Sequence, residues 1–256
     1  MAARWLICVV VLIGACARME DVAQEIGLND PPAPPPVTVD ILCDTSPGAP
    51  CTEATLLATI EVVLPQIAQR PGSTLRLWSM GETVADTSVI GSVTSTPPAK
   101  TTVQARNAHA ERFLTTERSY LQKAAEPLFA THPRRSPIAE TMSKVLLSTS
   151  SGTRHLVVIT DAREVSDLSN FECGQLPKTE QWLKRLHDVR VLSPGSLRDT
   201  HVAFIHVEYA RIDRERCPVT MQRIAQTNEL WRAAFQSAGA NSSTITNTGL
   251  TLEDEQ

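Results

Sequence analysis

The 256-residue chain has few aromatic residues, little net charge and none of the motifs that mark common zinc or serine-hydrolase sites. Aromatic side chains make up 4% of the residues, which argues against the stacking platforms that bind nucleic-acid bases. The formal net charge of -4 gives no electrostatic reason to expect nucleic acid as a partner. The sequence has no C-x-x-C pair for zinc and no G-x-S-x-G elbow for a nucleophilic serine. What remains is an ordinary globular composition, with enough apolar residues for one good core.

Residues 1–15 predict a signal peptide that is not part of the fold. An arginine precedes the apolar run Trp5–Ala15, which is too short to span a bilayer comfortably but has the length of a signal h-region. The run closes on Leu12-Ile-Gly-Ala-Cys16, which resembles a bacterial lipobox. The resemblance implies cleavage before Cys16 and lipidation of its thiol, and the Ala17 that follows implies sorting to the outer membrane. The alternatives are a plain signal peptide or a short anchor with an incidental cysteine.

A proline-rich segment separates the predicted lipid from the first strand. Residues 16–36 end in Pro31-Pro-Ala-Pro-Pro-Pro36, a run that favours extended polyproline II and acts as a semi-rigid tether. At about 3 Å per residue, the tether would hold the domain at most roughly 50 Å from the membrane. We therefore expect an exported protein, lipid-anchored in the bacterial cell envelope, on the outer membrane and facing the periplasm.

The cysteines that remain after export predict disulfides. Of the six cysteines, loss of Cys8 with the signal peptide and lipidation of Cys16 leave Cys43, Cys51, Cys173 and Cys217. Thiols in an exported domain argue for disulfides, although three connectivities are formally possible. Local pairing is favoured, which joins Cys43 to Cys51 and Cys173 to Cys217.

Residues 37–250 predict a single α/β domain. The apolar runs Val37–Cys43 and His155–Thr160 suit inner strands of a parallel sheet with helices on both faces. Further strands are expected at Ser73–Ser79, Ser88–Thr94 and Thr200–Val207, and an edge strand after Ala240. Helices are expected over Thr52–Ala68, Ala105–Ala130, Pro137–Leu147, Thr179–His187 and Thr220–Ala238, with Pro65 kinking or ending the first. This alternation predicts a Rossmann-like fold with a central, mostly parallel sheet, followed by the acidic tail 251–256.

Both inner strands run straight into an aspartate. Val37–Cys43 is followed by Asp44 and Ser46, and His155–Thr160 is followed by Asp161. A carboxylate just beyond such a strand lies in the crevice where open α/β sheets bind their ligands. Two carboxylates at one edge would hold a cation or work as a catalytic pair.

The order of these motifs resembles the von Willebrand factor A (VWA) domain. The chain passes from a strand to Asp44-x-Ser46, then to Ser136-Pro-Ile-Ala-Glu140 at the start of a helix, and then to Leu156-Val-Val-Ile-Thr-Asp161. The metal-ion-dependent adhesion site of this family uses D-x-S-x-S, a threonine and a second aspartate. The resemblance covers Val37 to about Leu250. It implies that Asp44, Ser46, Ser136 and Asp161 are metal ligands.

The predicted ligands are oxygens, which suit Mg²⁺ or Mn²⁺. In the family the cation keeps one open position, which an acidic residue of a partner protein completes. Here the third motif position is Gly48 rather than serine, and water would have to replace that hydroxyl. Structural alternatives stay open: Ser136 could cap its helix, Asp44 and Ser46 could bond only to their own turn, and Asp161 could orient the loop behind it.

Side chains near this edge of the sheet would shape recognition. Arg134, Arg135, Arg163 and Glu164 are expected to flank the rim, although the first two could equally belong to a solvated loop. The favoured disulfides would stiffen the same edge, because one closes the Asp44 loop and the other ties together two neighbouring loops. Stabilisation of an exported domain is the alternative reason for both bridges.

Three functions are compatible with these features. The first is an envelope lipoprotein, without enzymatic activity, that binds a protein partner through a metal-assisted VWA-like site. The second is a metal-free scaffold of the same fold, which the absent hydroxyl at Gly48 favours. The third is a hydrolase, which is disfavoured because phosphohydrolases that form an aspartyl-phosphate carry Asp-x-Asp where this chain has Ser46. Substitution of Asp44 separates the first two, since partner binding should collapse only in the metal-assisted case.

Overall fold

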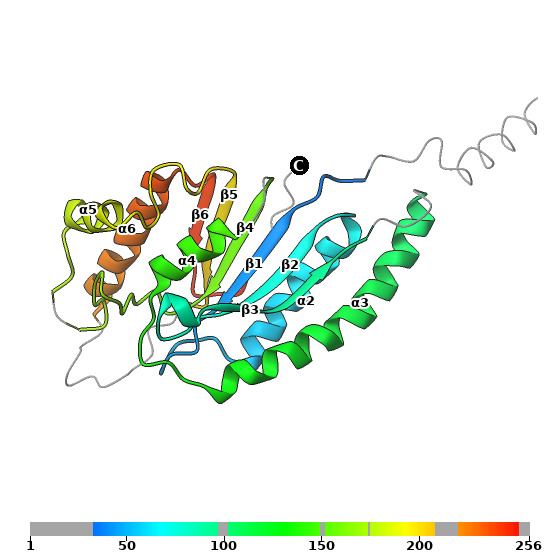
Figure 1. Cartoon of the computed structure of the whole chain (residues 1–256), viewed down its shortest axis with the longest axis horizontal. Coiled ribbons are helices and arrows are strands. Elements are labelled where there is room, and N and C mark those ends of the chain that lie inside the picture. Colours follow the sequence, from blue (N-terminus) through cyan, green and yellow to red (C-terminus); the bar gives the residue numbers. More distant parts are fainter. Residues whose placement is uncertain (1–32, 97–101, 149–151, 174, 208–219, 251–256) are drawn as a thin grey trace, which may run out of the picture.

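The computed structural model describes residues 33–96, 102–148, 152–173, 175–207 and 220–250, and these residues form a mixed sheet with helices on both faces (Figure 1). The strands are β1 (Thr38–Cys43), β2 (Thr74–Ser79), β3 (Ser88–Thr94), β4 (Arg154–Ile159), β5 (Thr200–Ile205) and β6 (Ser242–Ile245). They form a 6-stranded sheet in the order β3-β2-β1-β4-β5-β6. Every neighbouring pair is parallel except β2 and β3, which are antiparallel. The predicted α/β, Rossmann-like fold class is confirmed.

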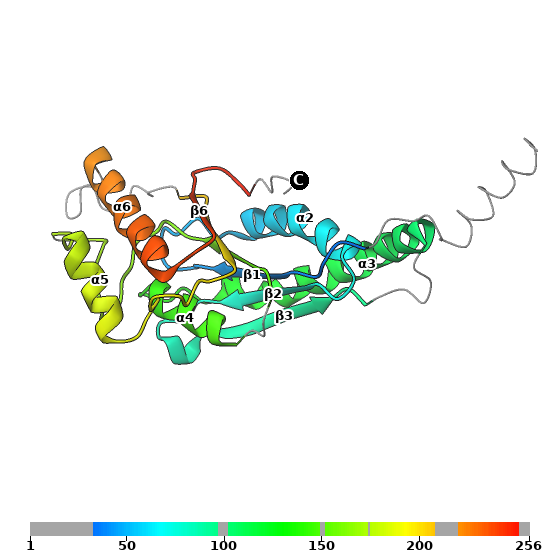
Figure 2. The same cartoon turned by 90° about the horizontal axis from the view of Figure 1, so that it is seen from above.

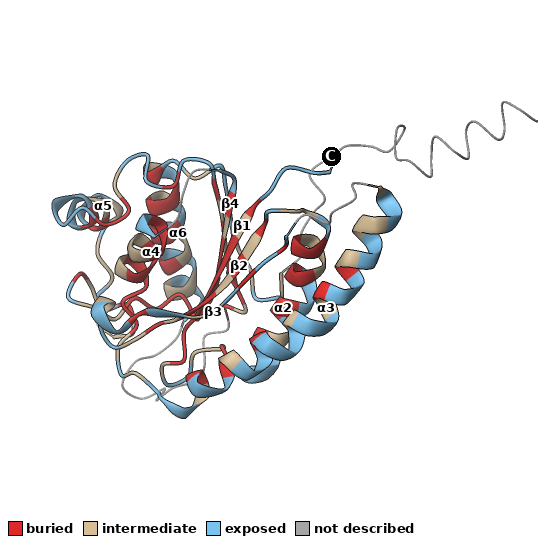
Figure 3. Cartoon of the chain, turned by 45° about the vertical axis from the view of Figure 1, so that its right-hand side comes forward, coloured by how far each residue is buried: buried red, intermediate tan, exposed pale blue. Residues whose placement is uncertain are grey.

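The helices divide between the two faces of the sheet. They are α2 (Glu53–Gln69), α3 (Val103–Ala125), α4 (Ile138–Leu147), α5 (Thr179–Asp188) and α6 (Met221–Ala238), with short 3₁₀ turns η1 (Val84–Asp86) and η2 (Glu126–Ala130). α2 and α3 cover one face, while α4 and α6 cover the other and α5 packs against α6 (Figure 3). α5 and α6 lie at one end of the molecule, and the first turns of α3 lie at the other (Figure 2). No helix in the described ranges combines the length and apolar character needed to cross a membrane.

α2 begins after the predicted N-cap residue and continues beyond Pro65. Thr52 is its N-cap, and its hydroxyl accepts a hydrogen bond of 3.2 Å from the N–H of Thr55. The prediction that Pro65 could end the helix is wrong, since α2 continues to Gln69. One missing backbone hydrogen bond is outweighed here because the turns on either side bury a continuous apolar stripe, which includes the fully buried Ile67.

The long helix predicted over Ala105–Ala130 is α3 followed by the 3₁₀ turn η2, which has a proline in its first turn. α3 packs against α2 and β3, so it covers the part of the sheet that lies outside α2 (Figure 1). The helix can approach β3 because Gly91 has no side chain. A Cβ atom at Gly91 would lie 3.2 Å from the Cβ of Ala124, which is tighter than ordinary contact.

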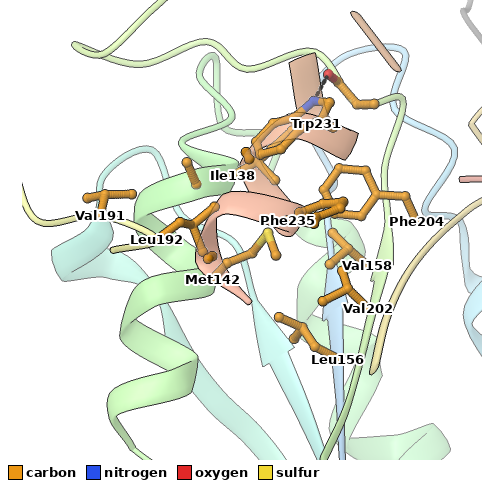
Figure 4. Packing of buried hydrophobic residues seen from close by; sticks show 14 of the residues in the cluster. Ile138, Met142, Leu156, Val158, Val191, Leu192, Val202, Phe204, Trp231 and Phe235 are labelled. Carbon is orange, nitrogen blue, oxygen red and sulfur yellow. Dashed lines mark hydrogen bonds between the residues drawn. The ribbon is translucent and has the colours of Figure 1, made fainter. Parts of the chain in front are cut away.

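The core on the α4 and α6 side holds most of the aromatic side chains. Its fully buried rings are Phe171, Trp182, Phe204, Trp231 and Phe235. Phe204, on β5, has its ring centroid 5.1 Å from those of both Trp231 and Phe235 (Figure 4). The Trp231 indole N–H donates a hydrogen bond of 2.8 Å to the carbonyl of Ala162, drawn as a dashed line in Figure 4. This bond ties the core to the loop that follows β4.

Several predicted segments lie outside the described residues. They are the signal peptide, the lipidation site Cys16, the tether up to residue 32 and the acidic tail.

We predict that Trp231→Phe destabilises the fold by about 1–3 kcal/mol more than Trp182→Phe. Both tryptophans are 0% exposed, so the two variants lose similar packing. Only Trp231 makes a bond that is lost, because the indole nitrogen of Trp182 has no hydrogen-bond partner within the described residues. Urea unfolding of both variants measures the difference, and equal losses would contradict the role given to the Trp231 bond.

Candidate functional site

The predicted site residues meet at one edge of the sheet. β1 and β4 are parallel neighbours in register to their last residues, so the segments behind them leave the sheet side by side. The Ser136 hydroxyl lies 3.1 Å from Oδ1 of Asp44 and 2.7 Å from the hydroxyl of Ser46. Asp161 lines the same pocket as Ser46 and Ser136. The sequence motifs therefore named residues that the fold brings together from three separate segments.

Asp44 is completely buried and both of its carboxylate oxygens accept hydrogen bonds. Oδ1 accepts from the Ser46 N–H at 3.0 Å and from Ser136, and Oδ2 accepts from the Thr160 hydroxyl at 2.9 Å. The Ser136 hydroxyl has one hydrogen, so it donates either to Asp44 Oδ1 or to the Ser46 hydroxyl at any one time. Burial nevertheless raises the pKa of Asp44, and these hydrogen bonds offset only part of that effect. Thr160 was missed in the sequence, although its place directly before Asp161 was the available signal.

Asp161 is held on both sides by Arg163. Its Oδ1 accepts from the Arg163 backbone N–H at 3.0 Å, and its Oδ2 accepts from Nε at 2.6 Å and forms an ion pair with Nη2. The two side chains are 4% and 7% exposed, so this pair is screened from water. Burial and the neighbouring Asp44 raise the pKa of Asp161 to about 6, against the opposing effect of Arg163. Arg163 lines the pocket, as expected of a residue beside the site, but its side chain is largely buried rather than exposed on the rim.

Glu164 takes the capping role that was considered for Ser136. α4 begins at Ile138 with Pro137 at the N-cap, and no side chain of that cap bonds to the helix. The Oε2 atom of Glu164 instead accepts a hydrogen bond of 2.9 Å from the N–H of Ala139, in the first turn of α4. The prediction that Glu164 flanks the rim is wrong, since it is 0% exposed. Ser136 is thereby free to serve the site.

Burial of Glu164 changes its protonation. Its Oε1 atom has no hydrogen-bond partner of acceptable geometry within the described ranges, and burial raises its pKa to about 8. The side chain of Ser166 and the Ala139 N–H oppose this shift. At neutral pH the folded protein therefore keeps this carboxyl mostly protonated.

The loop behind β4 is fixed by backbone contacts. Ala162 has a φ of 62°, a left-handed conformation that is unfavourable for a residue with a Cβ. It is held by a 3.1 Å bond from its N–H to the Thr160 hydroxyl and by the Trp231 bond to its carbonyl. Ser136 and Val165 exchange two backbone hydrogen bonds of 3.1 and 3.0 Å, which joins this loop to the start of α4.

The disulfide predicted between Cys43 and Cys51 is confirmed, with the two Cα atoms 5.6 Å apart. It closes the loop that carries Asp44. Cys173 is also disulfide-bonded, but its partner lies outside the described residues, so the pairing with Cys217 stays a prediction.

A pocket of about 90 Å³ opens at this edge of the sheet. It is lined by Ser46, Pro47, Arg134, Ser136, Asp161, Arg163, Val165 and Glu172. Arg134 is exposed, as expected for a rim residue. Arg135 pairs with the exposed Asp167 at 2.6 Å and does not line the pocket. The pocket thus combines two arginines with two carboxylates around two serines.

The donor set has the right chemistry for a divalent cation but is already bonded within the protein. In the described part of the chain, no group of three or more histidine, cysteine, aspartate or glutamate side chains is arranged to hold a metal ion. The predicted ligand set contains two such side chains, Asp44 and Asp161, together with two serines. All four carboxylate oxygens of Asp44 and Asp161 accept protein hydrogen bonds. The guanidinium of Arg163 stands where a cation would neutralise Asp161. The present arrangement therefore fits this guanidinium better than a metal ion.

Comparison with known proteins assigns no family to this chain. No protein-family model matches the chain, and no curated protein sequence does. The PilB minor pilin from Streptococcus sanguinis is similar with a TM-score of 0.49 and 9% identity, covering 85% of this chain and 58% of that one. A mutant of that pilin gives a TM-score of 0.44 at 9% identity, covering 86% and 59%. A von Willebrand factor type A protein from Catenulispora acidiphila gives 0.32 at 13% identity, covering 67% of this chain and 33% of that one.

These solved structures are longer than the present chain. It spans 59% or less of each of them.

We predict that Glu164→Gln makes the stability of the protein less sensitive to pH. Between about pH 4.5 and pH 8 the unfolded chain gives up the Glu164 proton while the folded protein keeps it, so the free energy of unfolding of the wild type falls as pH rises. The expected fall from this group is on the order of a few kcal/mol and is absent in the variant. Glutamine can still accept the Ala139 N–H bond.

Urea unfolding at pH 5, 6, 7 and 8 measures this difference. Glu180→Gln, an exposed position on α5, is the control and should follow the wild-type curve. Parallel curves for the wild type and Glu164→Gln would contradict a protonated, buried Glu164.

Proposed function

We propose that this chain is an envelope-anchored lipoprotein whose VWA-like domain binds a protein partner at the pocket beside Asp44. The observation that carries this proposal is the meeting of Asp44, Ser46 and Ser136 within 3.1 Å, from the segments that the family motif names. The strand order and the helices on both faces are compatible with that family. The sheet edge with the carboxyl ends of the parallel strands is also where open α/β sheets bind ligands.

The chemistry of the pocket favours an acidic group on the partner. Arg134 is exposed at the rim, and Arg163 lines the pocket while its Nη1 atom has no acceptor among the described residues. Guanidinium groups with unused N–H donors bind carboxylates in a defined geometry. Glu172 lines the same pocket and would select against a partner with a second acidic group at that point.

The proposed anchor would present this pocket away from the membrane. The described chain enters the sheet at the first residues of β1, whereas the pocket lies behind the last residues of β1 (Figure 1). At about 3.3 Å per residue, a strand of this length separates the two points by roughly 20 Å. A lipid on Cys16, followed by the proline-rich tether, would therefore leave the pocket open to a partner in the periplasm.

Two modes of binding are considered for the same pocket. In the first, Mg²⁺ or Mn²⁺ at Asp44, Ser46, Ser136 and Asp161 bridges to the partner. In the second, the domain is a metal-free scaffold and the arginines bind the partner directly. The ion pair between Arg163 and Asp161 favours the second mode, because a metal would have to displace a buried guanidinium.

We also propose that the site binds without catalysis. A nucleophilic serine needs a base hydrogen-bonded to its hydroxyl. Within the described residues the Ser46 and Ser136 hydroxyls bond to each other and to the buried Asp44, and no histidine bonds to either. These hydroxyls are therefore assigned to the architecture of the pocket.

We predict that a photo-crosslinking residue at position 172, in cells that make the full chain, yields a defined protein adduct. Arg134→Ala should lower the yield of this adduct about tenfold, because it removes an exposed guanidinium that lines the proposed binding pocket. The yield is measured by immunoblotting and the adduct is identified by mass spectrometry.

Arg112, exposed on α3, provides the matched controls. Arg112→Ala should leave the adduct unchanged, and a crosslinker at position 112 should not produce it. Partner binding at the pocket is refuted if position 172 gives no adduct, or if both alanine variants lower its yield equally.

A further inference from the structure

We propose that Arg163 is a built-in cation that takes the place of a divalent metal in the site beside Asp44. This role belongs to the pocket of the proposed function, and it is tested with metal ions alone, so either proposal can fail without the other. Three features of the chain support it: the contacts of Arg163, the backbone that positions it, and the loop that lacks a third hydroxyl.

Arg163 bonds to both carboxylate oxygens of Asp161. Its backbone N–H bonds to one carboxylate oxygen at 3.0 Å, and its Nε and Nη2 atoms engage the other. The side chain of Arg163 is 7% exposed, so the ion pair is largely buried. A metal ion that used Asp161 would leave this positive charge buried without its partner, at a considerable electrostatic cost.

The backbone between the two residues is arranged for this pair. Ala162 adopts its left-handed conformation between Asp161 and Arg163, so that the N–H and the side chain of Arg163 both reach back to the same carboxylate. The Thr160 hydroxyl and the Trp231 indole stabilise Ala162 in that conformation. A strained residue that is held by buried partners indicates a required geometry rather than an incidental surface contact.

The first loop is built without the third hydroxyl of the family motif. Gly48 stands at that position with a φ of 81°, a conformation that serine adopts only with strain. The bridge between Cys43 and Cys51 encloses this turn and limits its rearrangement. The loop therefore lacks one oxygen ligand, and its backbone disfavours the side chain that would supply it.

A metal ion or a guanidinium would neutralise the same buried negative charge here. Asp44 and Asp161 are both buried behind the neighbouring strands β1 and β4, and two buried carboxylates need a positive charge close by. A tethered arginine supplies that charge without binding from solution. Removal of Arg163 should therefore create a cation-binding site that the wild type does not have.

The test compares the full chain, purified in detergent, with Arg163→Ala in EDTA and in millimolar Mn²⁺. We expect Arg163→Ala to lower Tm by several degrees in EDTA, roughly as for loss of a buried ion pair, and Mn²⁺ to restore at least half of the loss. Mn²⁺ should not shift the wild type. Loss of the free-ion signal in electron paramagnetic resonance should show Mn²⁺ bound to the variant alone, and Asp161→Asn added to Arg163→Ala should abolish that binding.

Two further variants keep the test decisive. Arg135→Ala removes a neighbouring arginine that pairs with Asp167 outside the pocket, and it should gain no Mn²⁺ binding. Arg163→Gln replaces Arg163→Ala if the alanine variant does not fold. The proposal is overturned if the wild type binds Mn²⁺ in a manner that Asp44→Asn abolishes, or if neither Arg163 variant binds more Mn²⁺ than the wild type does.

Discussion

The burial of Asp44 and Asp161 at one edge of the sheet is the constraint on which the surrounding structure depends. Two carboxylates without water are costly, and each makes ionisation of the other harder. Neighbouring groups stabilise each carboxylate in a different way. Thr160, Ser46 and Ser136 donate hydrogen bonds to the first carboxylate, and Arg163 neutralises the second. Every carboxylate oxygen of Asp44 and Asp161 therefore has a donor within the protein.

The hydrophobic cores on the two faces of the sheet hold this network through different contacts. The aromatic core under α6 reaches the site directly, because Trp231 bonds to the carbonyl behind Asp161. On the other face, α2 and the disulfide hold the loop that carries Asp44. α4 contributes its N-terminus, where Glu164 takes up the Ala139 N–H and leaves Ser136 to the site. Preorganised edges of this kind favour binding, because little order is lost when a partner docks.

The sequence predicts the fold better than it predicts the interior of the site. Apolar runs that end in aspartate identify β1 and β4, and their parallel pairing follows from the alternation of strands and helices. The same reasoning brought Asp44, Ser46, Ser136 and Asp161 together. It placed Arg163 and Glu164 on the rim, because charged residues are usually exposed. Their burial depends on the turn at Ala162 and on the orphan N–H groups of α4, neither of which is visible in residue types.

Two features distinguish this site from the metal site of the VWA motif that the sequence resembles: the missing hydroxyl at Gly48 and the arginine beside Asp161. The absence of a hydroxyl at Gly48 would by itself weaken a metal site, and an arginine beside Asp161 would by itself compete with a metal. In this chain the two features occur together: one oxygen ligand of the VWA motif is absent, and the guanidinium of Arg163 neutralises Asp161. A tethered cation pays no entropy for capture from solution and does not depend on the metal content of the surroundings. The same guanidinium keeps Nη1 without an acceptor in the described residues, at a pocket that Arg134 also lines. Neutralisation of Asp161 and attraction of an acidic partner would then rest on one side chain.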